Sequence, residues 1–123
     1  MGPGGSQEAE FRLRASVPAG TYHVVCDAII IGPVDVTFAL IWHKGTSVVT
    51  LASWMQHWEP LASGDYVAQP YEIDVTAPAI DYHPGDQLVF RYAASNTTTP
   101  DAFIPAGGSP SEHGRIANIT LPQ

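Results

Sequence analysis

The sequence has few basic residues, and this shortage excludes two classes of protein. Five lysines and arginines stand against twelve acidic residues, so the formal net charge is −7. A nucleic-acid-binding protein needs a basic stripe that displaces counterions from phosphates. An anionic membrane surface also attracts basic residues. Nucleic acid is therefore excluded as a partner, and so is charge-driven membrane binding.

Cysteine and long apolar runs are equally scarce. The single cysteine, Cys26, excludes an intrachain disulfide framework. It lies in the apolar run 23–31, where a thiol is expected to pack as a small buried hydrophobe rather than to react. No run approaches the roughly 20 apolar residues of a membrane helix, so no membrane span is expected.

Helical periodicity is missing as well. Eleven glycines and eleven prolines interrupt the chain at short intervals, and between them apolar and polar residues alternate. Alternation with a period of two is typical of half-buried strands. With 45% hydrophobic and only 14% charged residues, the chain is expected to fold rather than to remain disordered.

The alternating runs predict seven to eight strands. They cover residues 11–17, 22–31, 34–43, 48–55, 71–76, 87–95 and 115–121. The run 22–31 is apolar on both faces, which predicts either a strand covered on both sides or one that switches faces at a bulge. Gly45 and the segment 84–86 are expected in tight turns.

Two long connections, near residues 57–70 and 96–113, decide between all-β architectures. Such crossings suit an antiparallel β-sandwich of the jelly-roll or Greek-key type better than a simple meander. The predicted domain spans residues 10–123, and residues 1–9 are expected to form a flexible tail. For the Gly-rich start, two interpretations stay open: a cloning remnant, or the tether of a lipid-anchored protein in which Met1 replaces the lipid-bearing cysteine.

Two late segments carry a family resemblance. The segments 84–92 (PGDQLVFRY) and 114–122 (GRIANITLP) resemble the closing strands of secreted bacterial jelly-roll domains, such as carbohydrate-binding modules and related lipoprotein domains. The resemblance covers about a quarter of the chain. It implies a jelly-roll fold and an extracytoplasmic location, either periplasmic, tethered to the outer membrane or secreted. It assigns no functional residue.

No catalytic constellation can be assigned, so the chain is not expected to be an enzyme. The Gly-x-Ser-x-Gly elbow of serine hydrolases is absent from the sequence. The carboxylates show no spacing that marks the acid and base of a glycosidase. Glu72 and Asp74 lie two apart on one strand face, where a solvated exterior is expected.

The sequence also contains no spacing typical of metal ligands, and no cofactor is expected. The five histidines form neither His-x-His nor His-x₃-His pairs. His43 and His57 would approach one another only if their strands pair as a hairpin. A structural calcium site built from loop aspartates is left open, although no Asp-x-Asp-x-Asp run supports it. Its candidate ligands are Asp81, Asp86 and Asp101.

Aromatic residues give the best functional signal. Trp42 shares the parity of Phe38 and Leu40 and is expected in the core, whereas Trp54 shares the more polar parity of Thr50 and Ala52. An exposed Trp or Tyr ring can stack on a sugar or anchor a protein interface. The alternative is that the loop folds its own aromatics over the core. The predicted ligand-binding residues are Trp54, His57, Trp58, Glu59 and Tyr66, with Trp58 and its neighbours in the loop.

Two functional hypotheses use these same residues. The first is a non-catalytic extracytoplasmic binding module whose ligand is a carbohydrate. The second is a structural or protein-interaction domain of the cell surface that pairs with another protein or with itself, because a chain rich in strands leaves strand edges free. The sequence does not separate them, and it leaves the oligomeric state open.

Overall fold

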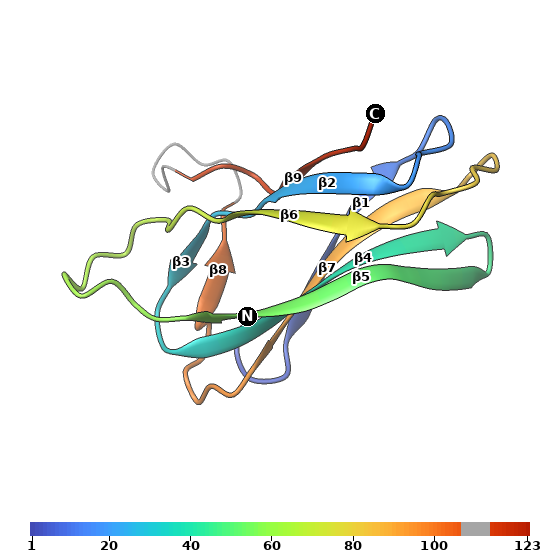
Figure 1. Cartoon of the computed structure of the whole chain (residues 1–123). Coiled ribbons are helices and arrows are strands. Elements are labelled where there is room, and N and C mark those ends of the chain that lie inside the picture. Colours follow the sequence, from blue (N-terminus) through green and yellow to red (C-terminus); the bar gives the residue numbers. More distant parts are fainter. Residues whose placement is uncertain (107–113) are drawn as a thin grey trace.

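The computed structural model describes residues 1–106 and 114–123, which form an all-β fold of antiparallel sheets (Figure 1). His113 and the end of the second predicted loop lie outside these residues. The described strands are β1 (Ser6–Arg12), β2 (Gly20–Val25), β3 (Ala28–Ile30), β4 (Val34–Lys44), β5 (Ser47–Trp58), β6 (Glu72–Ala77), β7 (Gln87–Ser95), β8 (Phe103–Pro105) and β9 (Asn118–Thr120).

Two sheets make the sandwich, and a short strand pair lies at one end. The larger sheet has the strand order β1-β7-β4-β5, and the smaller has the order β6-β2-β9. Strands β3 and β8 form the separate pair, which closes the end of the sandwich near the loop after β5 (Figure 1). The sandwich prediction is therefore confirmed, while its jelly-roll type stays a prediction.

Strand β4 is the centre of the fold because its alternation buries one face completely. Val34, Val36, Phe38 and Leu40 are all fully buried on that face. The Phe38 ring stacks on three other rings, with centroids 5.4 to 5.6 Å away; they belong to Trp54 in β5, Phe90 in β7 and Tyr71 just before β6. Trp42 continues this face and is 7% exposed, so its predicted core position is confirmed.

The run 22–31 is two strands rather than one. Strand β2 ends at Val25 and pairs with β6 and β9, whereas β3 begins at Ala28 and pairs with β8. Both faces of the run are apolar because the chain changes sheets at Cys26 and Asp27. Cys26 is fully buried, as expected.

The first strand lies earlier than predicted. Strand β1 pairs with β7 over Ser6–Arg12, so residues 6–9 of the expected tail belong to a sheet. The Met1 amine donates a 2.7 Å hydrogen bond to the Phe103 carbonyl. The predicted strand over residues 11–17 is wrong beyond Arg12. Leu13 and Val17 are buried there, but Val17 makes only an isolated bridge with Ile80.

Two loop predictions also need correction. Strand β5 extends to Trp58, so the first long loop begins at Glu59. The second contains β8, whose Phe103 is fully buried. The predicted turns are confirmed: Gly45 has a φ of 57°, and Asp86 N–H donates to the His83 carbonyl across Gly85. Among the described residues, no helix is long and apolar enough to cross a membrane.

Candidate functional site

The structure divides the five predicted site residues between the core and the surface. Trp58 is the main correction: it ends β5 instead of lying in a loop, and it is only 5% exposed. Its ring packs edge-on against Tyr71 and Phe103, with centroids 5.2 and 5.5 Å away. Trp58 therefore offers no free ring face to a ligand.

Trp54 lies on the core side of β5 because of a bulge. The pairing of β4 with β5 shifts by one residue between Leu40–Ala52 and Ile41–Thr50, which leaves Leu51 as the extra residue. A bulge of this kind reverses the alternation of the strand. The half-buried Trp54 ring stacks on Phe38, and its Nε1 donates a 3.0 Å hydrogen bond to the Tyr71 hydroxyl. The predicted polar face for Trp54 is therefore wrong.

His57 and Glu59 belong to an exposed ionic cluster at one end of β5. His57 Nδ1 lies 2.6 Å from Asp35 Oδ1, and Nε2 lies 2.5 Å from Glu59 Oε2. Asp35 also accepts a 2.7 Å hydrogen bond from Asn96. Strands β4 and β5 do form a hairpin, but His43 lies opposite Val48 and His57 lies opposite Asp35, so the two histidines are at opposite ends.

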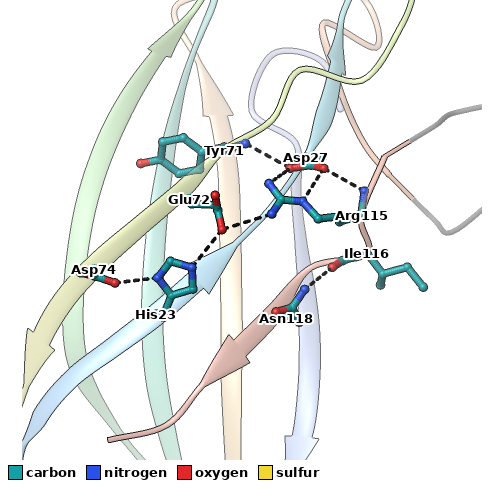
Figure 2. Close-up of polar contacts among 8 residues, drawn as sticks. All are labelled: His23, Asp27, Tyr71, Glu72, Asp74, Arg115, Ile116 and Asn118. Carbon is teal, nitrogen blue, oxygen red and sulfur yellow. Dashed lines mark hydrogen bonds and ion pairs between the residues drawn. The ribbon is translucent and has the colours of Figure 1, made fainter.

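A second histidine is held between two carboxylates on the smaller sheet. His23 Nδ1 lies 2.6 Å from Asp74, and Nε2 lies 3.1 Å from Glu72 (Figure 2). Ionised carboxylates only accept hydrogen bonds, so a ring with a proton on each nitrogen can donate to both. These hydrogen bonds raise the pKa of His23, the one to Asp74 most and the one to Glu72 next. The bonds to Asp35 and then Glu59 raise the pKa of His57.

Stability is expected to fall as these histidines lose their second proton. A histidine whose pKa is higher in the folded state than in the unfolded state stabilises the fold. This stabilisation is fully present below the unfolded pKa of about 6.5. That stabilisation disappears as the pH rises through the folded pKa. Urea unfolding of the wild type at pH 6 and pH 9 should therefore show a loss of stability that the double variant His23→Gln/His57→Gln largely lacks. His43→Gln is the control, because His43 has no carboxylate partner among the described residues. An equal pH dependence in all three proteins would contradict this account.

A buried aspartate anchors the segment before β9. Asp27 receives two side-chain hydrogen bonds of 2.9 Å from Arg115, and backbone N–H groups of Arg115 and Tyr71 donate to it as well (Figure 2). Burial alone would raise the pKa of Asp27, but these donors together hold that pKa below its usual range. Arg115 also pairs with Glu72 at 3.1 Å. The network ties residues 114–115 to β6 and to the β2–β3 junction.

Neither a metal centre nor a reactive thiol emerges from the described part of the chain. No group of three or more His, Cys, Asp or Glu side chains there is arranged to hold a metal ion. Of the calcium candidates, Asp86 is buried and accepts hydrogen bonds from Trp42 Nε1 and the His83 N–H. Burial, followed by the neighbouring Asp27, raises the pKa of the Cys26 thiol to about 12, so the thiol stays protonated.

A shallow pocket of about 530 Å³ lies at the end of the sandwich where β4 terminates. Trp42, Val17 and Ile80 line it. Its polar groups come from Ser16 and Asp81, and the Ser16 hydroxyl already accepts a hydrogen bond from the Tyr82 N–H. Converging polar groups, which orient a ligand in most binding pockets, are therefore few here.

The most distinctive surface is the free side of β5. Among the described residues, β5 pairs only with β4, so its other side is an open edge over Ser47–Trp58. We use "β5 edge" for residues 47–56 of this strand. Val48 is 62% exposed, Val49 38% and Met55 59%. All residues from Lys44 to Thr50 are exposed, so the tip of the hairpin lacks cover on both faces.

Charge distinguishes the β5 edge from two other sheet edges. Residues 47–56 contain no charged side chain, and His57 is the first ionisable residue after them. Strand β1 carries Glu8, Glu10 and Arg12, and β6 carries Glu72 and Asp74. Charged residues on an edge strand discourage pairing with other chains, and the β5 edge lacks this protection.

The loop after β5 adds exposed apolar surface. Tyr66 is 66% exposed and Val67 is 43% exposed. Tyr66 is thus the one predicted aromatic with a largely exposed ring. Val48 and Val49 were not predicted as site residues, although two adjacent valines in an alternating run place one apolar side chain on each face of a strand.

Comparison with known proteins found no matching family model, no matching curated protein and no matching solved structure.

Proposed function

We propose that the chain is a non-catalytic protein-interaction domain whose contact site is the β5 edge. The observation that carries the proposal is a long, uncharged edge strand with three exposed apolar side chains on a strongly acidic molecule. In strand addition, an extended partner hydrogen-bonds to a free edge, and alternate side chains provide specificity. The β5 edge offers both unpaired backbone and apolar side chains on each face.

Burial of the apolar side chains of the β5 edge would contribute a substantial part of the binding free energy. Fully burying an exposed Val or Met side chain contributes about 1.5 to 3 kcal/mol. Val48, Val49 and Met55 start from partial exposure, so together they would contribute roughly 4 kcal/mol. This energy must offset the entropy lost on association, and main-chain hydrogen bonds would add to it.

A carbohydrate ligand is the second candidate, and the exposed Tyr66 ring is the observation that favours it. A glycan array with the wild type and Tyr66→Ala tests this candidate. Glycan binding that Tyr66→Ala abolishes would support this candidate. Absence of binding to every glycan on the array would exclude those glycans as ligands. The proposed extracytoplasmic location rests on the resemblance of residues 84–92 and 114–122 to secreted domains.

A peptide selection tests the protein-interaction proposal. Random extended peptides displayed on phage are selected on the immobilised wild-type protein, and amide NMR shifts then locate the contact. We expect shifts centred on residues 47–56, and at least tenfold weaker binding to Val48→Lys and Met55→Lys, because each lysine places a charge at the seam. Ser6→Lys on β1 adds the same charge to the opposite edge and should bind normally. A selection that enriches no peptide on a monomeric form of the protein, or shifts centred on another edge, would contradict the proposal.

A further inference from the structure

We infer that the partner strand is β5 of a second copy of this chain, so that two four-stranded sheets join across a two-fold axis. This inference rests on the proposed function and names its partner. The two β5 strands would run antiparallel, and the joined sheet would have the order β1-β7-β4-β5-β5-β4-β7-β1. The bulge, the positions of the exposed side chains and the charges support it in turn.

The bulge sets which residues can meet. Val48 pairs with His43 and Met55 pairs with Thr37 in the β4–β5 hairpin. His43 and Thr37 lie on the same face of β4, the face away from the core, so Val48 and Met55 share that face although they are seven residues apart. In an unbulged strand, residues seven apart point to opposite faces. A two-fold axis perpendicular to the sheet keeps each face on its own side, so Val48 can oppose Met55 of the second copy.

In this register, residues that face one another across the two β5 strands lie on the same face of the joined sheet. With Val48 opposite Met55, Val49 lies opposite Trp54 on the core side. Thr50 lies opposite Ser53 on the outer side. At the centre, Leu51 of each copy opposes Ala52 of the other, so each extra residue has a partner and the seam has no unpaired position. The two most exposed apolar side chains of the strand thus bury one another.

Charge favours this pairing over other edges of the same molecule. Each copy carries a formal charge of −7, which opposes association in general. The β5 edge is neutral, whereas pairing β5 with β1 or β6 would place acidic residues at the seam. At each end of the seam, Glu59 of one copy approaches the hairpin end of the other, where the exposed Lys44 ends β4. Opposite charges therefore meet where the two strands end.

Cysteine trapping on the full chain tests the register directly. Opposite residues have Cβ atoms about 4.5 to 5.5 Å apart, close to the spacing of a disulfide. A mixture of Val48→Cys and Met55→Cys proteins, and the double variant, should form disulfide-linked dimers under mild oxidation. Either single variant alone should not, because position 48 lies about 23 Å from its own counterpart in this register. Wild-type protein is the control for Cys26, which is buried.

Light scattering after size exclusion completes the test. Wild type and Ser6→Lys should be dimeric, and Val48→Lys and Met55→Lys should be monomeric. A monomeric wild type, or single variants that cross-link as readily as the mixture, would overturn the inference. If the wild type is a monomer whose β5 edge still binds selected peptides, only the self-pairing is ruled out. If the monomer binds no peptide, the proposed function is ruled out as well.

Discussion

Phe38→Ala is expected to lower the free energy of unfolding by about 4 kcal/mol. Phe38 is fully buried at the middle of β4, and its ring stacks on Phe90 in β7 and on Tyr71 just before β6. Its removal leaves a cavity that those rings can fill only by losing their own contacts. Urea unfolding measures the change.

Trp54 provides a second readout of the same substitution. Its ring rests on Phe38 with centroids 5.6 Å apart, so its emission should shift to longer wavelength when the cavity forms. Thr37→Ala is the control, since Thr37 is the exposed neighbour on the same strand and should change stability by less than about 0.5 kcal/mol. A loss below about 1 kcal/mol for Phe38→Ala would contradict the packing described for Phe38.

Asp27→Ala is expected to lower the free energy of unfolding by about 3 kcal/mol. The substitution removes the acceptor of two backbone N–H groups and of the Arg115 guanidinium. The N–H groups lose their partner inside the fold, and Arg115 loses its anchor. Residues 114–115 should then lose their attachment to the β2–β3 junction, while Arg115 keeps its pair with Glu72 of β6.

The matched control is Asp65→Ala, because Asp65 is exposed in the loop after β5. It should unfold like the wild type. Asp27→Asn keeps the shape but loses the charge, so its stability should lie between those of the wild type and Asp27→Ala. Equal stability of Asp27→Ala and Asp65→Ala would show that the Arg115 contacts contribute little.

Alternation alone predicted the strands whose two faces differ most. Residues 34–43 and 87–95 correspond to β4 and β7, and residues 71–76 overlap β6. In each case one face is markedly more buried than the other, so the period of two is visible in the sequence. The core position of Trp42 follows from the same pattern.

Edges and bulges could not be predicted in this way. Strand β1 is mostly exposed, with Glu8 and Glu10 in it, so its pairing with β7 depends on the tertiary structure rather than on an apolar pattern. Sequence alone placed Trp54 on the wrong face because nothing in it marks the bulge at Leu51. Trp58 seemed to belong to a loop because His57 and Glu59 flank it, whereas these residues bond to each other outside the core.

Amide hydrogen exchange at low and high protein concentration measures whether β5 of one copy pairs with β5 of another. Protection in residues 47–56 should rise with concentration, while protection in β1, on the opposite edge of the same sheet, should stay unchanged. Protection in residues 47–56 that is independent of concentration, or a rise centred on β1, would contradict self-pairing through the β5 edge.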